Sequence, residues 1–211
     1  MADKAKVLKT AVAVGSLGLV PAYHFLRDGK NPLTLEALRA VYPRLAAADA
    51  ARYLRPLNKA LREGGLLTPR RAAAFLAQLG HESGELRYWE ELASGAKYEG
   101  REDLGNTQAG DGVRYKGRGP IQVTGRANYR AAGAALGLPL EEQPELVATV
   151  DVGFRAATWY WNSRKLSALA DVGTLESFRT ITLRINGGQN GAADREAKWD
   201  AAKAVLGDGT A

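Results

Sequence analysis

The 211-residue sequence has no cysteine and only two histidines, His24 and His81. Without cysteine, disulfides, thiol catalysis and cysteine-ligated metal sites are excluded. The two histidines lie far apart in the sequence, so we expect no multi-histidine metal site. The sequence also has no serine in a nucleophile-elbow pattern and no glycine-rich loop followed by Lys-Ser or Lys-Thr. By elimination, the sequence predicts chemistry carried by carboxylates, without a metal or a cofactor.

Signatures of nucleic-acid binding are absent too, although the chain is basic. The formal net charge is +6, and lysine and arginine are spread along the sequence rather than gathered in a tail. Such a charge favours a polyanionic partner, and a nucleic acid, a membrane surface or an anionic cell wall would satisfy it. Because no zinc-finger spacing, basic zipper or aromatic RNA-binding motif occurs, we do not expect a nucleic-acid partner. Nothing in the sequence requires more than a monomer.

Residues 1–32 differ from the rest of the chain. Three lysines at positions 4, 6 and 9 precede an apolar stretch over residues 10–20, which Pro21 ends. This order is typical of a signal peptide, but no small-x-small cleavage site follows, and the stretch is too short to span a bilayer comfortably. A segment for export or membrane contact, an N-terminal helix docked on the domain and a misassigned start all remain open. We therefore separate an N-terminal extension, residues 1–32, from a domain over residues 33–211.

From residue 33 onward the sequence reads as a series of helices with short caps between them. Residues 121–124 alternate apolar and polar side chains and predict a short strand or extended segment. The glycine-rich polar stretch 93–115 predicts a long loop, functional or mobile. The fold class is therefore mainly α, in a single domain with a minor extended element. The predicted helices cover residues 34–45, 48–63, 69 to just before Gly84, 127–136, 151–164, 175–185 and 193–206.

Glu82 stands where the apolar face of a predicted helix should continue. The helix begins after the cap Thr68-Pro69, and its apolar residues recur at helical spacing until Glu82 and Ser83 take the next positions of the same face. A buried carboxyl group must be hydrogen-bonded, paired or used, because desolvation disfavours its charged form. Two interpretations remain: a general acid, and a structural ion pair with an arginine.

Glu91 is the candidate for a second acid, because it follows Glu82 beyond the break at Gly84. Two carboxylates separated by such a turn can face each other across a cleft. Glu90 is its immediate neighbour and competes for the role. The plain alternative is that both glutamates form a solvated acidic patch.

Several blocks of the sequence resemble glycoside hydrolase family 19. They are the run Gln-Leu-Gly-His-Glu-Ser-Gly at residues 78–84, Glu91, the block Tyr-Lys-Gly-Arg-Gly-Pro-Ile-Gln-Val-Thr-Gly-Arg-Ala-Asn-Tyr at residues 115–129, and Ile-Asn-Gly-Gly at residues 185–188 with Arg195 downstream. The resemblance covers roughly residues 33–207. The short connection between the two acids is similar to the bacteriophage and bacterial endolysins of the family rather than to its plant chitinases.

The resemblance implies a lysozyme-like fold with a cleft between two helical lobes, and a role for each matching residue. Glu82 matches the general acid, Glu91 the general base, and Thr124 the hydroxyl residue that helps the base to hold the attacking water. His81 is expected to orient the site by hydrogen bonding, and Tyr115 and Arg118 are either substrate contacts or loop anchors. The further substrate-binding matches are Gln122, Asn128, Asn186 and Arg195, the last an arginine that interacts with the acids.

The expected function is therefore an endolysin that hydrolyses β-1,4 bonds next to N-acetylated sugars in peptidoglycan. An inverting mechanism needs a protonated acid and an ionised base about 6.5–9.5 Å apart. The alternatives are a chitinase acting on chitin oligomers, a lytic transglycosylase, and a wall-binding module without turnover. Such an enzyme would be made in the cytoplasm of a bacterial host and act on the wall in the periplasm, released either by residues 4–20 or by a separate holin-type pore. Trp89, Trp159 and Trp161 could stack on sugars, although helical tryptophans favour the core.

Overall fold

The computed structural model describes residues 33–209. The predicted N-terminal extension, residues 1–32, and its interpretation as an export segment or docked helix lie outside the described residues. Within residues 33–209, none of the helices combines the length and the apolar character that crossing a membrane requires.

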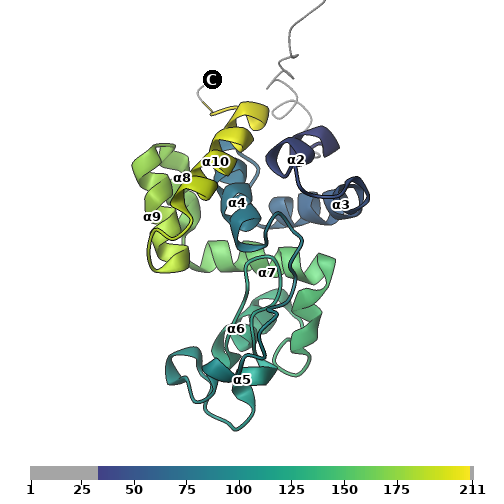
Figure 1. Cartoon of the computed structure of the whole chain (residues 1–211), viewed down its shortest axis with the longest axis vertical. Helices are drawn as coiled ribbons and strands as arrows, with labels where there is room; N and C mark the ends of the chain where they lie inside the picture. Colours follow the sequence, from purple (N-terminus) through teal and green to yellow (C-terminus); the bar gives the residue numbers. More distant parts are fainter. Residues whose placement is uncertain (1–32, 210–211) are drawn as a thin grey trace, which may run out of the picture.

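The described chain is a succession of helices, which confirms the mainly α fold class (Figure 1). The predicted helix positions are largely correct, but α5, α8 and three short 3-10 helices were not predicted. The helices are α2 (Leu35–Val41), α3 (Ala47–Glu63), α4 (Pro69–Glu82), α5 (Asp111–Arg114), α6 (Arg126–Leu136), α7 (Val150–Ser163), α8 (Leu166–Val172), α9 (Leu175–Asn186) and α10 (Ala192–Leu206), and the 3-10 helices are η1 (Ala96–Tyr98), η2 (Glu102–Leu104) and η3 (Pro144–Ala148).

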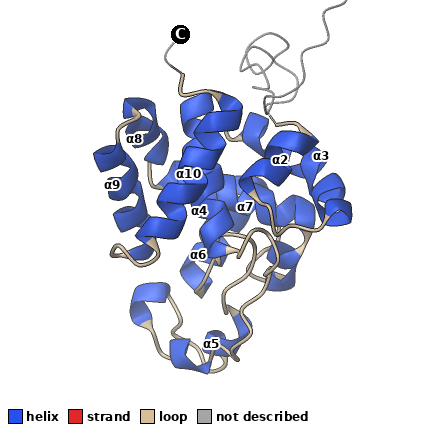
Figure 2. Ribbon diagram, turned by 45° about the horizontal axis from the view of Figure 1, so that its top comes forward, coloured by secondary structure: helices blue, strands red, loops and turns tan. Residues whose placement is uncertain are grey.

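Helix α4 is the centre of the larger group of helices, and α10 packs along it. Every residue from Ala72 to Gly80 is buried, so the helix touches neighbours on all sides. Gly80 is required for close packing, because a Cβ there would lie 2.4 Å from Cε1 of Tyr42. Figures 1 and 2 show α8 and α9 on one side of this pair, α2 and α3 on the other, and the smaller group around α5 beyond α7. The described chain therefore has two unequal helical lobes.

The chain reverses sharply where α4 ends, directly after Glu82. The Ser83 hydroxyl accepts a hydrogen bond from the backbone N–H of Leu86 at 2.7 Å and donates one to the Leu79 carbonyl at 2.6 Å. Gly84, Glu85 and Leu86 then follow each other in the left-handed region, with φ of 58°, 64° and 62°. Non-glycine residues adopt this conformation at a cost, so the surrounding contacts must hold the turn. The reversal directs the following segment back toward residues 117–119.

The strand predicted at residues 121–124 does not form, and the prediction is wrong. Gln122 has a φ of 55°, outside the β region, and the segment folds as a tight turn. Arg118 and Val123 exchange two backbone hydrogen bonds, of 2.9 and 3.1 Å, across it. The side chains of Gln122 and Thr124 therefore cannot be placed by strand alternation.

The stretch 93–115 is not a long structureless loop, because it contains η1, η2 and α5. The Glu99 carboxylate accepts backbone hydrogen bonds from Gly110 at 2.7 Å and from Gly112 at 2.8 Å, which ties the two ends of the stretch together. The sequence has little apolar periodicity here because hydrogen bonds from backbone amides, rather than a buried stripe, hold the segment.

Candidate active site

Glu82 is the last residue of α4, and its side chain is mostly buried, with 22% exposed. Its Oε1 lies 2.6 Å from Nη2 of Arg195, a residue of α10 whose side chain is 2% exposed. The apolar face of α4 brings the carboxylate to this position, as the sequence predicts. The ion pair that formed the structural alternative is also present, so burial alone does not decide between the two interpretations.

Arg195 is held from three sides. Its Nη1 donates to Gln78 Oε1 at 2.6 Å, and its Nε donates to the Asn190 carbonyl at 3.2 Å. Gln78 is itself buried and donates to the Thr182 hydroxyl at 2.8 Å. A guanidinium group fixed in this way presents a positive charge to Glu82 in one orientation.

Glu91 follows the left-handed turn and lies against residues 116–118. Its side chain is 15% exposed, and its Oε1 lies 2.9 Å from the Lys97 ammonium and 3.3 Å from the Tyr98 hydroxyl. Its Oε2 accepts the Gly117 backbone N–H at 3.2 Å. Burial raises the pKa of Glu91, but Lys97, the Gly117 N–H and the Tyr98 hydroxyl outweigh burial, and the pKa lies below its ordinary value. The carboxylate is therefore kept ionised, as a general base requires.

Gly117 lets three polar side chains meet at one point. A Cβ on this glycine would lie 2.6 Å from Gln122 Oε1 and 3.3 Å from both Glu91 Oε2 and Thr124 Oγ1. These three oxygens therefore lie around the space that a side chain on Gly117 would occupy. The structure brings the predicted base, the predicted hydroxyl residue and a predicted substrate amide into one cluster, which we call the base cluster: Glu91, Gly117, Gln122 and Thr124.

The turn at residues 119–125 fixes the rest of the base cluster. The Gln122 amide donates to the Gly119 carbonyl at 3.0 Å, and the Thr124 hydroxyl donates to the Gln122 carbonyl at 2.9 Å. Asn128, in the first turn of α6, donates from Nδ2 to the Thr124 carbonyl at 2.8 Å. Asn128 thus stabilises the turn by a hydrogen bond from α6, and its predicted substrate contact stays a prediction.

His81 lies beside Glu82 and contacts α10. Its Nδ1 lies 2.7 Å from Asp194 Oδ2, and the other carboxylate oxygen of Asp194 lies 2.6 Å from the ammonium of buried Lys198. Because a carboxylate only accepts, Nδ1 carries the proton that joins His81 to Asp194. The predicted orienting role thus has a hydrogen-bonded partner, Asp194, that the sequence did not identify.

Asn186 ends α9 and is half-buried. Its Nδ2 is buried and has no hydrogen-bond partner among the described residues. A buried amide without a partner is costly, so a ligand that accepts from it would be favoured. This supports the predicted sugar contact without testing it.

Tyr115 and Arg118 hold the loop in this structure, which favours the loop-anchor interpretation over substrate contact. Tyr115 is buried, and its hydroxyl donates to the Glu141 carbonyl at 2.9 Å. Arg118 is buried too, and its Nη1 donates to the Arg114 carbonyl at 2.8 Å. Its Nε lies 3.2 Å from Glu90 Oε1.

Glu90 differs from Glu91 in exposure and in partners. Its side chain is 45% exposed and pairs with Lys116 and Arg118, each at 3.2 Å. Its carboxylate pairs with these two cations rather than with Gly117, Gln122 or Thr124. The geometry therefore favours Glu91 over Glu90 as the base.

The tryptophans pack mainly in the core. Trp161 is fully buried and packs edge-on against Phe75, with ring centroids 5.5 Å apart. Trp89 is partly buried between Tyr53 and Phe154. Trp159 is also partly buried against the core, which agrees with the expectation that helical tryptophans favour the core.

Several residues that were not predicted from the sequence are hydrogen-bond or ion-pair partners of the predicted site residues. Lys97 and Tyr98 bind Glu91, Gln78 holds Arg195, and Asp194 holds His81. Gln78 lies one helical turn before Glu82, so a polar residue on the same apolar face was a usable signal. Lys97 and Asp194 carried no such signal, because each is one charge among many in a polar segment. Among residues 33–209, no cluster of His, Asp or Glu could hold a metal ion.

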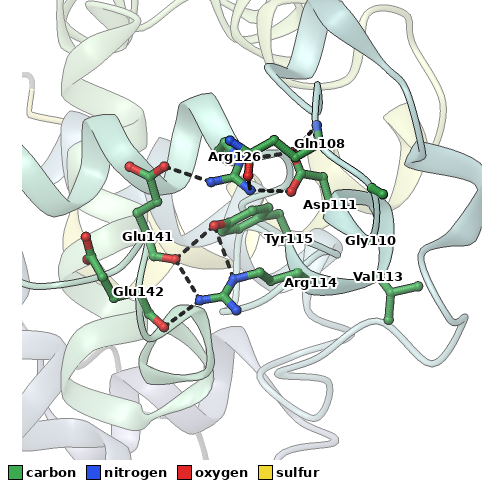
Figure 3. A pocket seen from close by; sticks show the side chains of 10 residues that line it. Gln108, Gly110, Asp111, Val113, Arg114, Tyr115, Arg126, Glu141 and Glu142 are labelled. Carbon is green, nitrogen blue, oxygen red and sulfur yellow. Dashed lines mark hydrogen bonds and ion pairs between the residues drawn. The ribbon is translucent and has the colours of Figure 1, made fainter.

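A hollow of about 710 Å³ in the smaller lobe is lined mainly by polar and charged side chains, but neither Glu82 nor Glu91 lines it (Figure 3). Figure 3 shows its side chains bonded to each other: Arg126 pairs with Asp111 and Glu141, and Arg114 donates to the Glu142 carbonyl at 2.8 Å. Arg130 and Arg126 lower the pKa of Glu141 to about 2. These mutual contacts stabilise the lobe that carries the base cluster.

Comparison with known proteins finds similar sequences and structures for the part of the chain that carries this site. A family model described as chitinase class I, glycoside hydrolase 19, matches residues 65–169, which include both acids and the base cluster. A glycosyl hydrolase family 19 domain-containing protein of Haemophilus influenzae is 29% identical over 196 residues, covering 78% of this chain and 88% of that protein. Chitinase C of Streptomyces griseus is similar in structure, with a TM-score of 0.67 and 30% identity over 82% of this chain and 92% of that one.

The plant relatives share only part of their length with this chain. The endochitinase At2g43610 of Arabidopsis thaliana is 43% identical over 126 residues, covering 59% of this chain. The chain spans 42% of the length of that relative.

Proposed function

The chain belongs to glycoside hydrolase family 19, and from that membership we propose that it hydrolyses β-1,4 glycosidic bonds next to N-acetylated sugars in peptidoglycan. The single observation that carries the proposal is the base cluster. In it the Glu91 carboxylate and the Thr124 hydroxyl lie beside Gly117, each 3.3 Å from the point where a Cβ on this glycine would lie. That arrangement suits two groups that hold one water molecule between them.

On the acid side, Glu82 gives its proton to the leaving glycosidic oxygen. The carboxylate that remains is stabilised by Arg195 at 2.6 Å, so the developing negative charge meets a positive group already in place. Gln78 and the Asn190 carbonyl keep that guanidinium from turning away. The contact between Glu82 and Arg195 is therefore an ion pair of the fold that also stabilises the carboxylate formed during the reaction.

On the base side, Glu91 accepts a proton from water while Thr124 orients that water. The water attacks the anomeric carbon on the face opposite the leaving group, which inverts its configuration. His81 and Asn186 are proposed to contact the sugar from the larger lobe, and Gln122 from the smaller one.

Peptidoglycan is favoured over chitin by charge. A chain of net charge +6 is attracted to a wall whose polymers are acidic, whereas chitin is neutral. The names of the similar plant and Streptomyces proteins favour the second candidate function, a chitinase. Both substrates contain N-acetylglucosamine, so the two proposals share one mechanism and differ in the polymer.

Hydrolysis of purified walls and of chitin oligomers, followed in parallel, tests the proposal. Peptidoglycan is expected to be cleaved faster, and mass spectrometry of the products should show reducing ends. Anhydro sugars would instead identify a lytic transglycosylase, and faster cleavage of chitin would identify a chitinase. Equal products from the wild type and Glu82→Gln would exclude an enzyme that uses this acid.

We further infer that the protein acts as an endolysin, made in the cytoplasm of a bacterial host and acting on the wall. Residues 4–20 are one candidate for delivery, and a separate pore is the other. Fractionating cells that express the full chain or a chain starting at Asn31 tests this. Equal retention of both in the cytoplasm would exclude delivery by residues 4–20.

A further inference from the structure

Lys97 is an exposed lysine that contacts the proposed base, Glu91, but lies outside the motifs that carry the family resemblance. It lies in η1, its side chain is 62% exposed, and its ammonium is 2.9 Å from Glu91 Oε1. The same ammonium lies over the Tyr98 ring, 4.8 Å from its centroid. An exposed side chain loses freedom when it is held in this way, so the contact must be favourable enough to offset that loss.

The other charged groups around Glu91 point elsewhere. Lys116 donates to the backbone carbonyl of Glu91 at 3.2 Å, and its ammonium pairs with the Glu90 carboxylate. Arg118 also pairs with Glu90. The hydroxyl of buried Tyr129 donates to the Lys116 carbonyl at 2.7 Å. Among residues 33–209, Lys97 is the cation that pairs with the Glu91 carboxylate itself.

We propose that Lys97 is a positioning residue for the base: its ammonium holds the Glu91 carboxylate ionised and in place, and so sets the acid limit of hydrolysis. This inference rests on the proposed function, because it takes Glu91 as the base. The ammonium contacts Oε1, whereas Oε2 accepts the Gly117 N–H, so the two carboxylate oxygens have different partners. Lys97 anchors Oε1 by charge, and Oε2 is the oxygen that accepts the proton from water in the proposed reaction.

The sign of the effect follows from the competing influences on Glu91. Burial raises its pKa, and Lys97 is the largest of the influences that lower it. If the ammonium is removed, burial is opposed only by the Gly117 N–H and the Tyr98 hydroxyl, so the pKa of Glu91 rises. The carboxylate is then protonated at higher pH, and activity is lost earlier as the pH falls.

The test compares Lys97→Met, Lys97→Arg and Lys59→Met with the wild type on one substrate. Lys59 is the matched control, because it is an exposed lysine, 48% accessible, paired with Asp151 at 3.2 Å on helices α3 and α7. The readout is the ratio of variant to wild-type kcat/KM across pH, which cancels any titration of the substrate. The acid limb of this profile reports the base in the free enzyme.

We expect the acid limb of Lys97→Met to move upward by about one pH unit. Lys97→Arg should keep the wild-type limb, because it keeps the charge, and Lys59→Met should not move it. A role in substrate binding alone would raise KM equally at every pH and leave the limb in place. That result would overturn the proposal.

A second measurement separates failure of this inference from failure of the proposed function. Carbon-13 NMR of labelled glutamate carboxyls follows the titration of Glu91 directly, with its signal assigned by its loss in Glu91→Gln. If Glu91→Gln is inactive but neither limb nor titration moves in Lys97→Met, the inference alone is overturned. If Glu91→Gln keeps full activity while the titration moves, the role of Glu91 as base is overturned, and with it the acid limit set by Lys97, although Lys97 still controls the ionisation of Glu91.

Discussion

The two carboxylates of the site are held in opposite ways. Glu82 ends a helix that is buried from Ala72 to Gly80, and its partner Arg195 is fixed by Gln78 of the same helix, which in turn donates to Thr182 of α9. Glu91 lies on a turn, and its partners are an exposed lysine and a backbone amide of a glycine.

This difference means that packing fixes the position of Glu82, whereas a few polar contacts set the position and the ionisation of Glu91. The acid side belongs to the packed core of the larger lobe, where a change of one side chain disturbs many contacts. The base side belongs to a polar segment where single hydrogen bonds hold position and ionisation. We therefore expect substitutions on the acid side to affect activity and stability together, and those on the base side to affect activity and its pH dependence.

The largest effect is expected for Glu82→Gln, which removes the proton that the leaving group requires. General acid catalysis contributes about 10²- to 10⁴-fold, so we expect kcat on peptidoglycan to fall by that range. The amide can still accept a hydrogen bond from Arg195, so the variant should fold, but loss of the ion pair should lower its melting temperature, which thermal unfolding measures. A variant that retains more than about a tenth of the wild-type rate would contradict Glu82 as the acid.

Next we expect Glu91→Gln to lose about 10²-fold or more in kcat, because glutamine cannot accept a proton from water. Glu90→Gln is the matched control and should stay within about threefold, since Glu90 is exposed and paired away from the cluster. Early products of the wild-type enzyme, examined by NMR, should be the α-anomer, because the proposed mechanism inverts a β-linkage. If Glu90→Gln proved the more damaging change, the comparison between the two sides would have the wrong base.

A smaller loss, about tenfold in kcat/KM, is expected for Gly117→Ala. The added methyl group would lie 2.6 Å from Gln122 Oε1 and 3.3 Å from the two oxygens that we assign to the water, so it displaces them. Gly188→Ala is the control, because a methyl group there meets no atom within 4 Å. Wild-type kinetics in Gly117→Ala would show that the cluster is not where the water is held.

The smallest effect is expected for Asp194→Asn, which weakens the contact with His81 Nδ1. One hydrogen bond is worth about 0.5–1.5 kcal/mol, so kcat/KM should fall about threefold to tenfold. Asp200→Asn, on the same helix and paired with Lys203 at 2.9 Å, serves as the control. The nitrogen-15 shifts of His81 should change in the first variant alone. Unchanged shifts would show that Asp194 does not set the tautomer of His81.

The helices of the domain and the position of Glu82 could be predicted from the sequence, because both follow from local spacing. Apolar residues three and four apart define a buried face wherever the helix packs, and Glu82 continues that face. The cap Thr68-Pro69 fixes where α4 begins, since the Thr68 hydroxyl accepts from the Arg71 N–H. The assignment of Glu82 as acid and Glu91 as base came from the order of whole motifs in the family resemblance, and it stays a prediction.

Only the tertiary structure decided how those residues are used. Residues 121–124 alternate like a strand, yet Gln122 turns to a φ of 55° because Arg118 and Val123 pair across it, a contact that no local pattern contains. The family resemblance implied that Arg195 interacts with the acids, but only the packing of α10 on α4 places it against Glu82. The pairing of Lys97 with Glu91 had no signal in the sequence and depends on a loop held by backbone amides. The sequence by itself therefore determined which residues can do chemistry, and packing determined which charges stand beside them.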